Sequence, residues 1–229
     1  MYRNLILLLI GMLGVAACAS TDTNLTTNTF ETVDNATILL VEPDVELTFL
    51  KAAGVSEVRA DWTDTGKENV LAEIARVVGD KGHRMIEYDV DPANERAVQI
   101  VKLHEVVGAT IIKHRFLDMP LPTKKGQFDW SLGPGMADLA EETGADYALF
   151  LFARGEYASA GRQTLAIGLA VLGGGSVSNG GQAAWASLVD MATGDVVWFN
   201  VAYTGPGTDM REPEGAEYLV GAILKDIPL

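Results

Sequence analysis

The chain has 229 residues, of which 31 are acidic and 17 are basic, so its formal net charge is −14 at neutral pH. Because such an acidic surface repels phosphates, we expect no nucleic-acid partner. The single cysteine, Cys18, has no partner within the chain for a disulfide, and the length favours one sizeable domain.

The first 18 residues have the pattern of a bacterial export signal. Arg3 precedes an apolar run, Leu5–Leu13, that is too short for a permanent membrane helix. The next segment ends in Val15-Ala16-Ala17-Cys18, which resembles the lipobox of bacterial lipoproteins, where the thiol receives a diacylglyceryl group before cleavage. The resemblance implies that residues 1–17 are a removed signal peptide and that Cys18 carries lipid, including palmitate-type acyl chains. An anchor of several acyl chains is effectively permanent.

The residues after Cys18 predict where the protein is held and how. Ala19 stands where enteric-type bacteria place the Asp that resembles an inner-membrane retention signal, so we expect an outer-membrane lipoprotein whose domain faces the periplasm. Residues 18–35 are rich in Thr and Asn and poor in large apolar side chains, which predicts a flexible tether. A coil of this length reaches roughly 20–25 Å. Residues 36–229 then form a single α/β domain.

The amino half of this domain alternates strand and helix patterns. Three runs have strand character: residues 36–41, 45–50 and 83–88. A capping box formed by Thr65 and Glu68, with Thr63 as a rival cap, predicts a helix that ends at Gly79. A second helix is predicted from Pro92 toward Gly108.

The middle of the chain is expected to be irregular before regular structure resumes. Residues 117–134 contain several prolines and glycines, which favours a surface loop. A short helix from Met136 to Glu142 should end at Gly144 as its C-terminal cap.

The carboxyl half is predicted to be mostly β. An apolar run, residues 146–157, is typical of a central strand, and residues 164–172 and 183–189 are predicted to form a hairpin around the glycine-rich tip 173–181. Asp190 can bond the amides of a tight turn in which Gly194 takes positive φ. A partner strand (196–203) and an amphipathic helix (214–225) follow. The whole pattern predicts an α/β fold with a mixed β-sheet and packed helices.

Two motifs in this half resemble known envelope proteins. The segment Leu188–Trp198 resembles a hairpin of the TolB amino-terminal domain and of the curli-channel and penicillin-binding-protein-activator lipoproteins. In those proteins a Gly-Ala-Asp-Tyr junction precedes the hairpin, as Gly144–Tyr147 does here, and a helix follows it. The resemblance spans Met136 to Ile227 and implies an α/β domain of that type. The amino half resembles uncharacterised exported bacterial proteins through residues 42–47 and 59–63.

Few residues suggest chemistry. The histidines, His83, His104 and His114, lack the paired spacing of zinc sites, and the sequence has neither a Gly-x-Ser-x-Gly elbow nor a phosphate-binding loop. We therefore expect no metal, no cofactor and no enzymatic activity.

The most interesting polar cluster is Arg59, Asp61 and Trp62, because it precedes a predicted helix start where an anion or a partner's carboxylate could dock. The alternative is a strand-to-helix corner with a local Arg–Asp pair and a buried Trp.

Three functional hypotheses remain. The first is a non-enzymatic binding or scaffold component of the cell envelope, bound to membrane lipid through Cys18 and to an envelope protein partner. The second is an oligomeric secretion or pore component that uses residues 163–189, a stretch without formal charge, as a hairpin. The third is an envelope hydrolase with an unrecognised carboxylate site.

Overall fold

The computed structural model describes residues 20–25, 33–117, 119–171 and 178–229. The predicted signal peptide and Cys18 lie outside the described residues, as do residues 26–32 of the predicted tether and most of the glycine-rich tip. In the described ranges, no helix is both long enough and apolar enough to cross a membrane.

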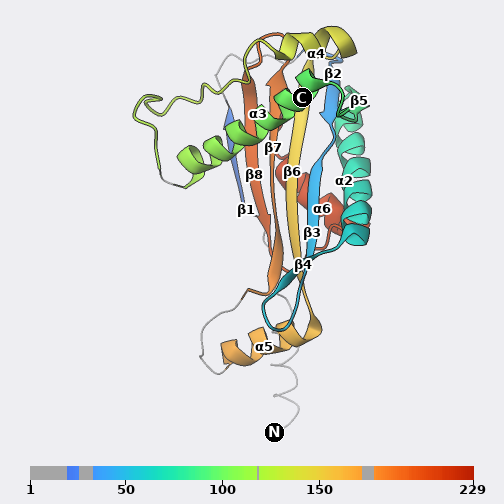
Figure 1. Ribbon diagram of the computed structural model, residues 1–229, viewed down its shortest axis with the longest axis vertical. Coiled ribbons are helices and arrows are strands. Elements are labelled where there is room, and N and C mark those ends of the chain that lie inside the picture. The colour runs from blue at the N-terminus through green and yellow to red at the C-terminus, as the bar shows by residue number, and fades with distance from the viewer. Residues whose placement is uncertain (1–19, 26–32, 118, 172–177) are drawn as a thin grey trace.

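The chain forms one mixed β-sheet with helices on both faces, which confirms the predicted α/β class (Figure 1). The strands are β1 (Ser20–Leu25), β2 (Thr37–Val41), β3 (Asp44–Leu50), β4 (Ser56–Val58), β5 (Arg84–Tyr88), β6 (Tyr147–Ala158), β7 (Gly180–Asp190) and β8 (Val196–Thr204). The helices are α2 (Ala60–Asp80), α3 (Glu95–Ile111), α4 (Met136–Thr143), α5 (Ala160–Val171) and α6 (Pro213–Ile223), with a π-helical turn, η1 (Ile112–Phe116), after α3.

The long strand β6 is the centre of the sheet. Strands β2 and β3 both pair with it in parallel, β2 along its first half and β3 along its second. Pro43 lies in the break between β2 and β3, which fits the inability of proline to donate to a strand ladder. The antiparallel neighbours β7, β8 and β1 follow on the other side of β6, so the sheet order is β1-β8-β7-β6-β2-β5.

Alternating side chains divide the apolar core into two clusters, one on each face of the sheet. Helices α2 and α6 cover the first face, where the largest fully buried side chains include Leu47, Ile74 and Trp198. Helices α3 and α4 cover part of the second face, together with the segment around Phe128. Trp185, stacked against Phe199, lies in the second cluster.

Several local predictions are confirmed. Gly144 ends α4 with φ of 68°, and Asp190 Oδ1 accepts hydrogen bonds from the amides of Ala192 and Thr193. Gly194 has φ of 79°, and a Cβ there would lie 2.0 Å from the Gly133 carbonyl oxygen. The segment between η1 and α4 is irregular, as its prolines and glycines predicted.

One predicted strand is wrong. Residues 164–172 were expected to be extended, but residues 160–171 form α5, so the hairpin predicted for residues 163–189 does not exist. The segment is apolar at nearly every position, so its pattern fits both periods. Ser159 Oγ accepts a hydrogen bond from the Arg162 amide at the start of the helix, in the manner of a cap. The pore hypothesis loses the hairpin on which it rested.

Other differences concern the ends of elements. Residues 20–25, predicted to be tether, form β1, which pairs antiparallel with β8. Backbone pairing with an edge strand does not require apolar side chains, so composition gave no sign of it.

Helix α2 begins at Ala60, ahead of the predicted caps, so Thr63 and Thr65 lie inside the helix, and its N-cap residue Arg59 makes no side-chain capping bond. The Thr63 hydroxyl accepts from the Leu47 amide, and the Thr65 hydroxyl donates to the Asp61 carbonyl.

Candidate functional site

The second face of the sheet is covered over only part of its length. Helix α3 crosses it where Gly108 lies against Trp185, and toward the α5 end no helix of the described chain lies over the strands (Figure 1). The uncovered strands form an open hollow of about 370 Å³, here called the sheet trough. Its lining consists of Glu46, Thr48, Arg154, Gly155, Glu156, Ser178, Gly180, Gly181, Gln182, Ala183 and Tyr203.

Small residues of β7 create the hollow. Gly181 and Ala183 face this side of the sheet, four and two positions before Trp185, where the cover of α3 ends. Gly180 and Gly181 have φ of 88° and 147°, and a Cβ on Gly180 would lie 2.2 Å from the Glu156 carbonyl oxygen. Only glycine fits there, so the β7 backbone itself forms the floor of the trough.

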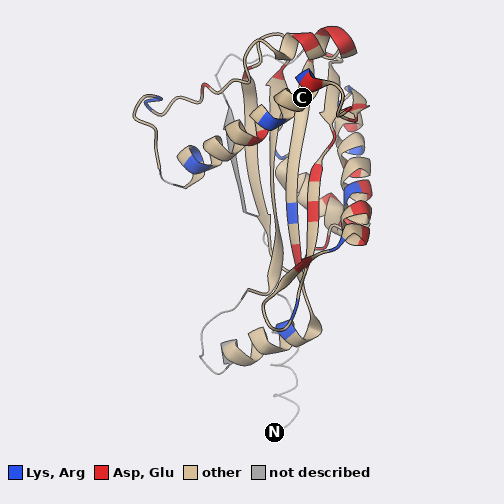
Figure 2. Ribbon diagram, in the orientation of Figure 1, with Lys and Arg blue, Asp and Glu red and all other residues tan. Residues whose placement is uncertain are grey.

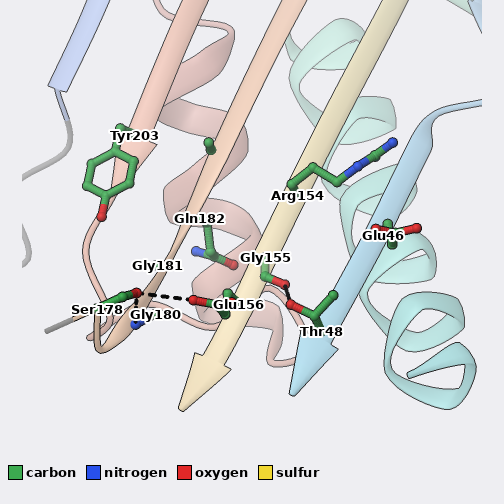
Figure 3. A pocket seen from close by; sticks show the side chains of 11 residues that line it. Glu46, Thr48, Arg154, Gly155, Glu156, Ser178, Gly180, Gly181, Gln182 and Tyr203 are labelled. Atoms are coloured by element: carbon green, nitrogen blue, oxygen red, sulfur yellow. Dashed lines mark hydrogen bonds between the residues drawn. The ribbon is translucent and has the colours of Figure 1, made fainter. Parts of the chain in front are cut away.

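Charged side chains form one wall of the trough. The Arg154 guanidinium donates to the Asp44 carbonyl at 3.0 Å and to its carboxylate at 3.1 Å, and lies 3.7 Å from the centre of the Phe152 ring. The Glu156 carboxylate accepts from Ser56 Oγ at 2.5 Å and from Ser178 Oγ at 3.1 Å, and the second of these bonds is drawn in Figure 3. These contacts hold both charges in fixed positions.

The opposite wall is aromatic and open to solvent. Tyr203 of β8 is 53% exposed and stands across the β7 backbone from Arg154 and Glu156 (Figure 3). Glu46 and Thr48 of β3 extend the charged wall, and the Thr48 hydroxyl donates to the Gly155 carbonyl at 3.3 Å. Tyr203 is amphipathic and presents both ring and hydroxyl at low entropic cost. The sheet trough therefore offers an aromatic surface, a guanidinium and carboxylates to a polar ligand or chain segment.

The predicted cluster of Arg59, Asp61 and Trp62 is brought together at the start of α2. Arg59 Nε and Nη2 donate to the two carboxylate oxygens of Asp61 at 3.0 and 2.7 Å. The Arg59 guanidinium also lies 4.5 Å from the centre of the half-buried Trp62 ring. This is the Arg–Asp pair of a strand-to-helix corner, and the hydrogen bonds from Arg59 lower the pKa of the exposed Asp61 carboxyl. Whether a partner binds this corner stays a prediction.

Residues remote in sequence complete this corner. The Arg211 guanidinium lies 4.0 Å from the Trp62 ring centre and 4.2 Å from that of Tyr157, and it is paired with Asp209. Burial acts to raise the pKa of Asp209, but hydrogen bonds from Arg211 outweigh it and lower that pKa. Burial and the Asp209 charge raise the pKa of Tyr157. Both guanidinium groups near Trp62 are thus already paired with a carboxylate.

The histidines have different surroundings. His104 lies on the buried side of α3 and stacks on Phe150 with ring centroids 3.9 Å apart, and its Nε2 lies 2.6 Å from Ser187 Oγ. Burial lowers the pKa of His104 to about 3, so this ring is a neutral core residue. His114 Nδ1 lies 2.5 Å from the Met119 carbonyl oxygen. Among the described residues, no three His, Cys, Asp or Glu side chains are grouped as metal ligands would be.

Sequence reasoning missed the sheet trough. Its only sign is the run Gly180-Gly181-Gln182-Ala183, in which the positions facing the trough carry little or no side chain. Gln182 bonds Tyr157 and Thr204 on the opposite face. The alternation of small residues with Gln182 could have indicated a strand with almost no side chains on one face. The sequence could not show that no described helix covers that face, because this depends on the tertiary structure.

No protein-family model matches the chain, and no curated protein matches it significantly. Among solved structures, the PelC dodecamer from Paraburkholderia phytofirmans is 12% identical, covers 93% of this chain and 98% of its own, and gives a TM-score of 0.43. Lipoprotein GNA1162 from Neisseria meningitidis is 15% identical, with coverages of 84% and 96% and a TM-score of 0.36. At these values the likeness carries no conclusion about what this chain binds or does.

Proposed function

We propose that the chain is a membrane-anchored lipoprotein that acts as a non-enzymatic binding or scaffold component of the bacterial cell envelope, with the sheet trough as its binding surface. Cys18 holds it in the outer membrane, and the domain faces the periplasm. The specific kinship with the TolB, curli-channel and activator lipoproteins belongs to this proposal as well. The observation that carries the binding role is the uncovered half of the second sheet face.

The contents of the sheet trough support recognition. Its charges are already held by neighbours, Arg154 by Asp44 and Glu156 by two serine hydroxyls, so the surface needs little reorganisation when a ligand arrives. An exposed tyrosine beside fixed charges is the kind of composition that binding surfaces use. The ligand class that fits is a polar segment of an envelope component with both donors and acceptors.

The anchor is tested by acylation and fractionation. Cells that express the full chain are labelled with radioactive palmitate, and inner and outer membranes are separated. We expect label in the outer-membrane fraction and none in the Cys18→Ser variant. A labelled Cys18→Ser protein, or an unmodified mature terminus in the wild-type chain, would refute the anchor.

The non-enzymatic role needs its own experiment, because two carboxylates, Glu46 and Glu156, lie in the sheet trough. Purified protein is incubated with peptidoglycan and with soluble glycans, and released fragments are measured. We expect no turnover above the level of a Glu156→Gln control. Turnover that disappears in this variant would support the hydrolase hypothesis instead.

A further inference from the structure

Helix α5 is an apolar helix that the other described residues leave largely exposed. None of the residues from 160 to 169 is buried, and Leu165 and Ile167 are 43% and 63% exposed. Two positions apart on a helix correspond to about 200° of rotation, so the two side chains point to different sides. Figure 2 shows α5 tan along nearly its whole length, in contrast to the charged α2. An exposed apolar surface of this kind indicates a site that contacts a membrane or another protein.

The register of β1 places the anchored end of the chain beside this helix. Ser20 pairs with Tyr203, and β1 runs away from that end of the sheet toward Leu25, which pairs with Trp198. Ser20, the first residue of β1, therefore lies at the end of the sheet where β6 finishes and α5 begins. Cys18 precedes Ser20 by two residues, so at most about 7 Å of chain separates them. A lipid on Cys18 would hold this end of the sheet close to the membrane.

The segments beside and within α5 lack the strong negative charge of the whole chain. The β3–β4 turn packs against α5, since a Cβ on Gly161 would lie 3.3 Å from Ala52 Cβ. Together, residues 51–57 and 160–171 carry two cations, Lys51 and Arg162, against one anion, Glu57. The whole chain carries a net charge of −14, so these two segments repel anionic headgroups less than the average surface of the chain does, although Glu156 adds a second anion beside Ser56. Val55 in the turn adds another exposed apolar side chain, at 58%.

We propose that α5 lies in the boundary between headgroups and acyl chains of the membrane that carries the Cys18 lipid, and so fixes the orientation of the sheet. The inference rests on the proposed lipidation of Cys18. An interfacial helix typically buries its apolar side about 5–10 Å into this boundary. With the lipid and α5 as two attachments, the sheet stands upright on the membrane and the sheet trough opens close to its surface. Anchoring by lipid alone would leave the domain free to tumble.

The depth of α5 is measured with a spin label on the mature, lipidated chain in phosphatidylethanolamine–phosphatidylglycerol vesicles. The natural sequence has only Cys18, whose thiol the lipid occupies, so an Ile167→Cys variant has a single free thiol. Val106→Cys in α3 is the matched control, since Val106 is 64% exposed and Ile167 is 63% exposed. Collisions of each label with oxygen and with a water-soluble nickel complex report its depth.

We expect the label at position 167 to collide with the nickel complex at least five-fold less often than the label at 106, and more often with oxygen. Equal nickel collisions at both positions in protein whose terminal peptide has the lipidated mass would overturn this inference and leave the anchor intact. An unlipidated terminal peptide would overturn both. Concentration-dependent immobilisation at position 167 in the Cys18→Ser protein without vesicles would show that a second copy covers α5, and would also overturn it.

Discussion

The two faces of the sheet are closed to different extents. On the first face, α2 and α6 cover strands from both halves of the chain, and the side chains beneath them are almost fully buried. On the second face, α3 covers one half, and the other half is the sheet trough. The contrast suggests a division of work, in which one face supplies stability and the other leaves backbone and polar side chains available to a partner.

A buried hydrogen-bond network illustrates the closed face. Gln182 Oε1 accepts from the Tyr157 hydroxyl at 2.8 Å and from the Met210 amide at 2.7 Å, while its Nε2 donates to the hydroxyls of Thr204 and Thr208. A buried amide with all these partners specifies one register of β6, β7 and β8. The part of β7 that presents only small residues to the trough is therefore held in position by the Gln182 hydrogen bonds on the first face.

Among the substitutions considered, we expect the largest loss of stability from a side chain buried on the first face, Leu47. Leu47 is fully buried, and a Cβ added to Gly66 or Gly155 would lie 2.8 or 2.7 Å from its methyl groups. We expect Leu47→Ala to lower the free energy of unfolding by about 2–5 kcal/mol through lost burial and a cavity. Urea denaturation measures this, with Tyr203→Ala as the control that should change stability by less than about 0.5 kcal/mol. Equal losses in both variants would remove the distinction between the faces.

The next largest effect is expected on the stability of the folded protein at acid pH, through His104 of α3. The buried His104 has a pKa of about 3, below its ordinary value, so protonation favours the unfolded chain as the pH falls below about 6.5. We expect His104→Gln, whose amide can still bond Ser187, to remove a loss of up to about 1.4 kcal/mol per pH unit between pH 6 and 4. Carboxylates titrate in both proteins, so the difference between their pH profiles isolates His104. Parallel profiles would mean that this ring is not kept neutral by burial.

A smaller effect tests how closely α3 sits on the sheet. An added Cβ on Gly108 would lie 2.4 Å from Trp185 Cη2, whereas one on Gly168 in α5 meets nothing within 4 Å. We expect Gly108→Ala to destabilise by about 1–3 kcal/mol through overpacking, reduced by about 1 kcal/mol of better helix propensity. Gly168→Ala should be neutral or stabilising by up to about 1 kcal/mol. Thermal unfolding of the unlipidated protein compares them, and a stabilised Gly108→Ala variant would mean that α3 is loosely placed.

Helices and strands with an unambiguous hydrophobic period or a local cap could be predicted from the sequence. Features that depend on how distant segments pack over one another could not. The junction at Gly144–Tyr147 was readable because the cap glycine and the strand after it are local features. In the structure, Asp146 adds a long-range role, since its carboxylate accepts from the Thr37 amide at 2.7 Å and ties β6 to β2.

Two parts of the molecule show why prediction failed elsewhere. The second part of α5, residues 165–171, carries no polar side chain, so the sequence did not distinguish a helix from a strand there. In the sheet, β6 already pairs with β2, β3 and β7, and β7 pairs with β6 and β8, so neither strand had a free edge for another strand. The second helix was predicted from Pro92 toward Gly108, and α3 continues past this glycine to Ile111. The close approach of Gly108 to Trp185 could not be predicted from the sequence. At the predicted cluster, the Arg59–Asp61 pair is the one named by the alternative interpretation, while Arg211 and Asp209 could not be assigned to the cluster from their position in the sequence.

Photocrosslinking in the native envelope tests the central claim that the sheet trough is the binding surface. A benzoylphenylalanine replaces Tyr203 in the trough or, as the matched control, Tyr218 on α6, which is 38% exposed. We predict a discrete crosslinked product from position 203 that falls at least ten-fold when Arg154→Ala and Glu156→Gln are added, with no such product from position 218. No product from position 203, or the same product from both positions, would contradict it.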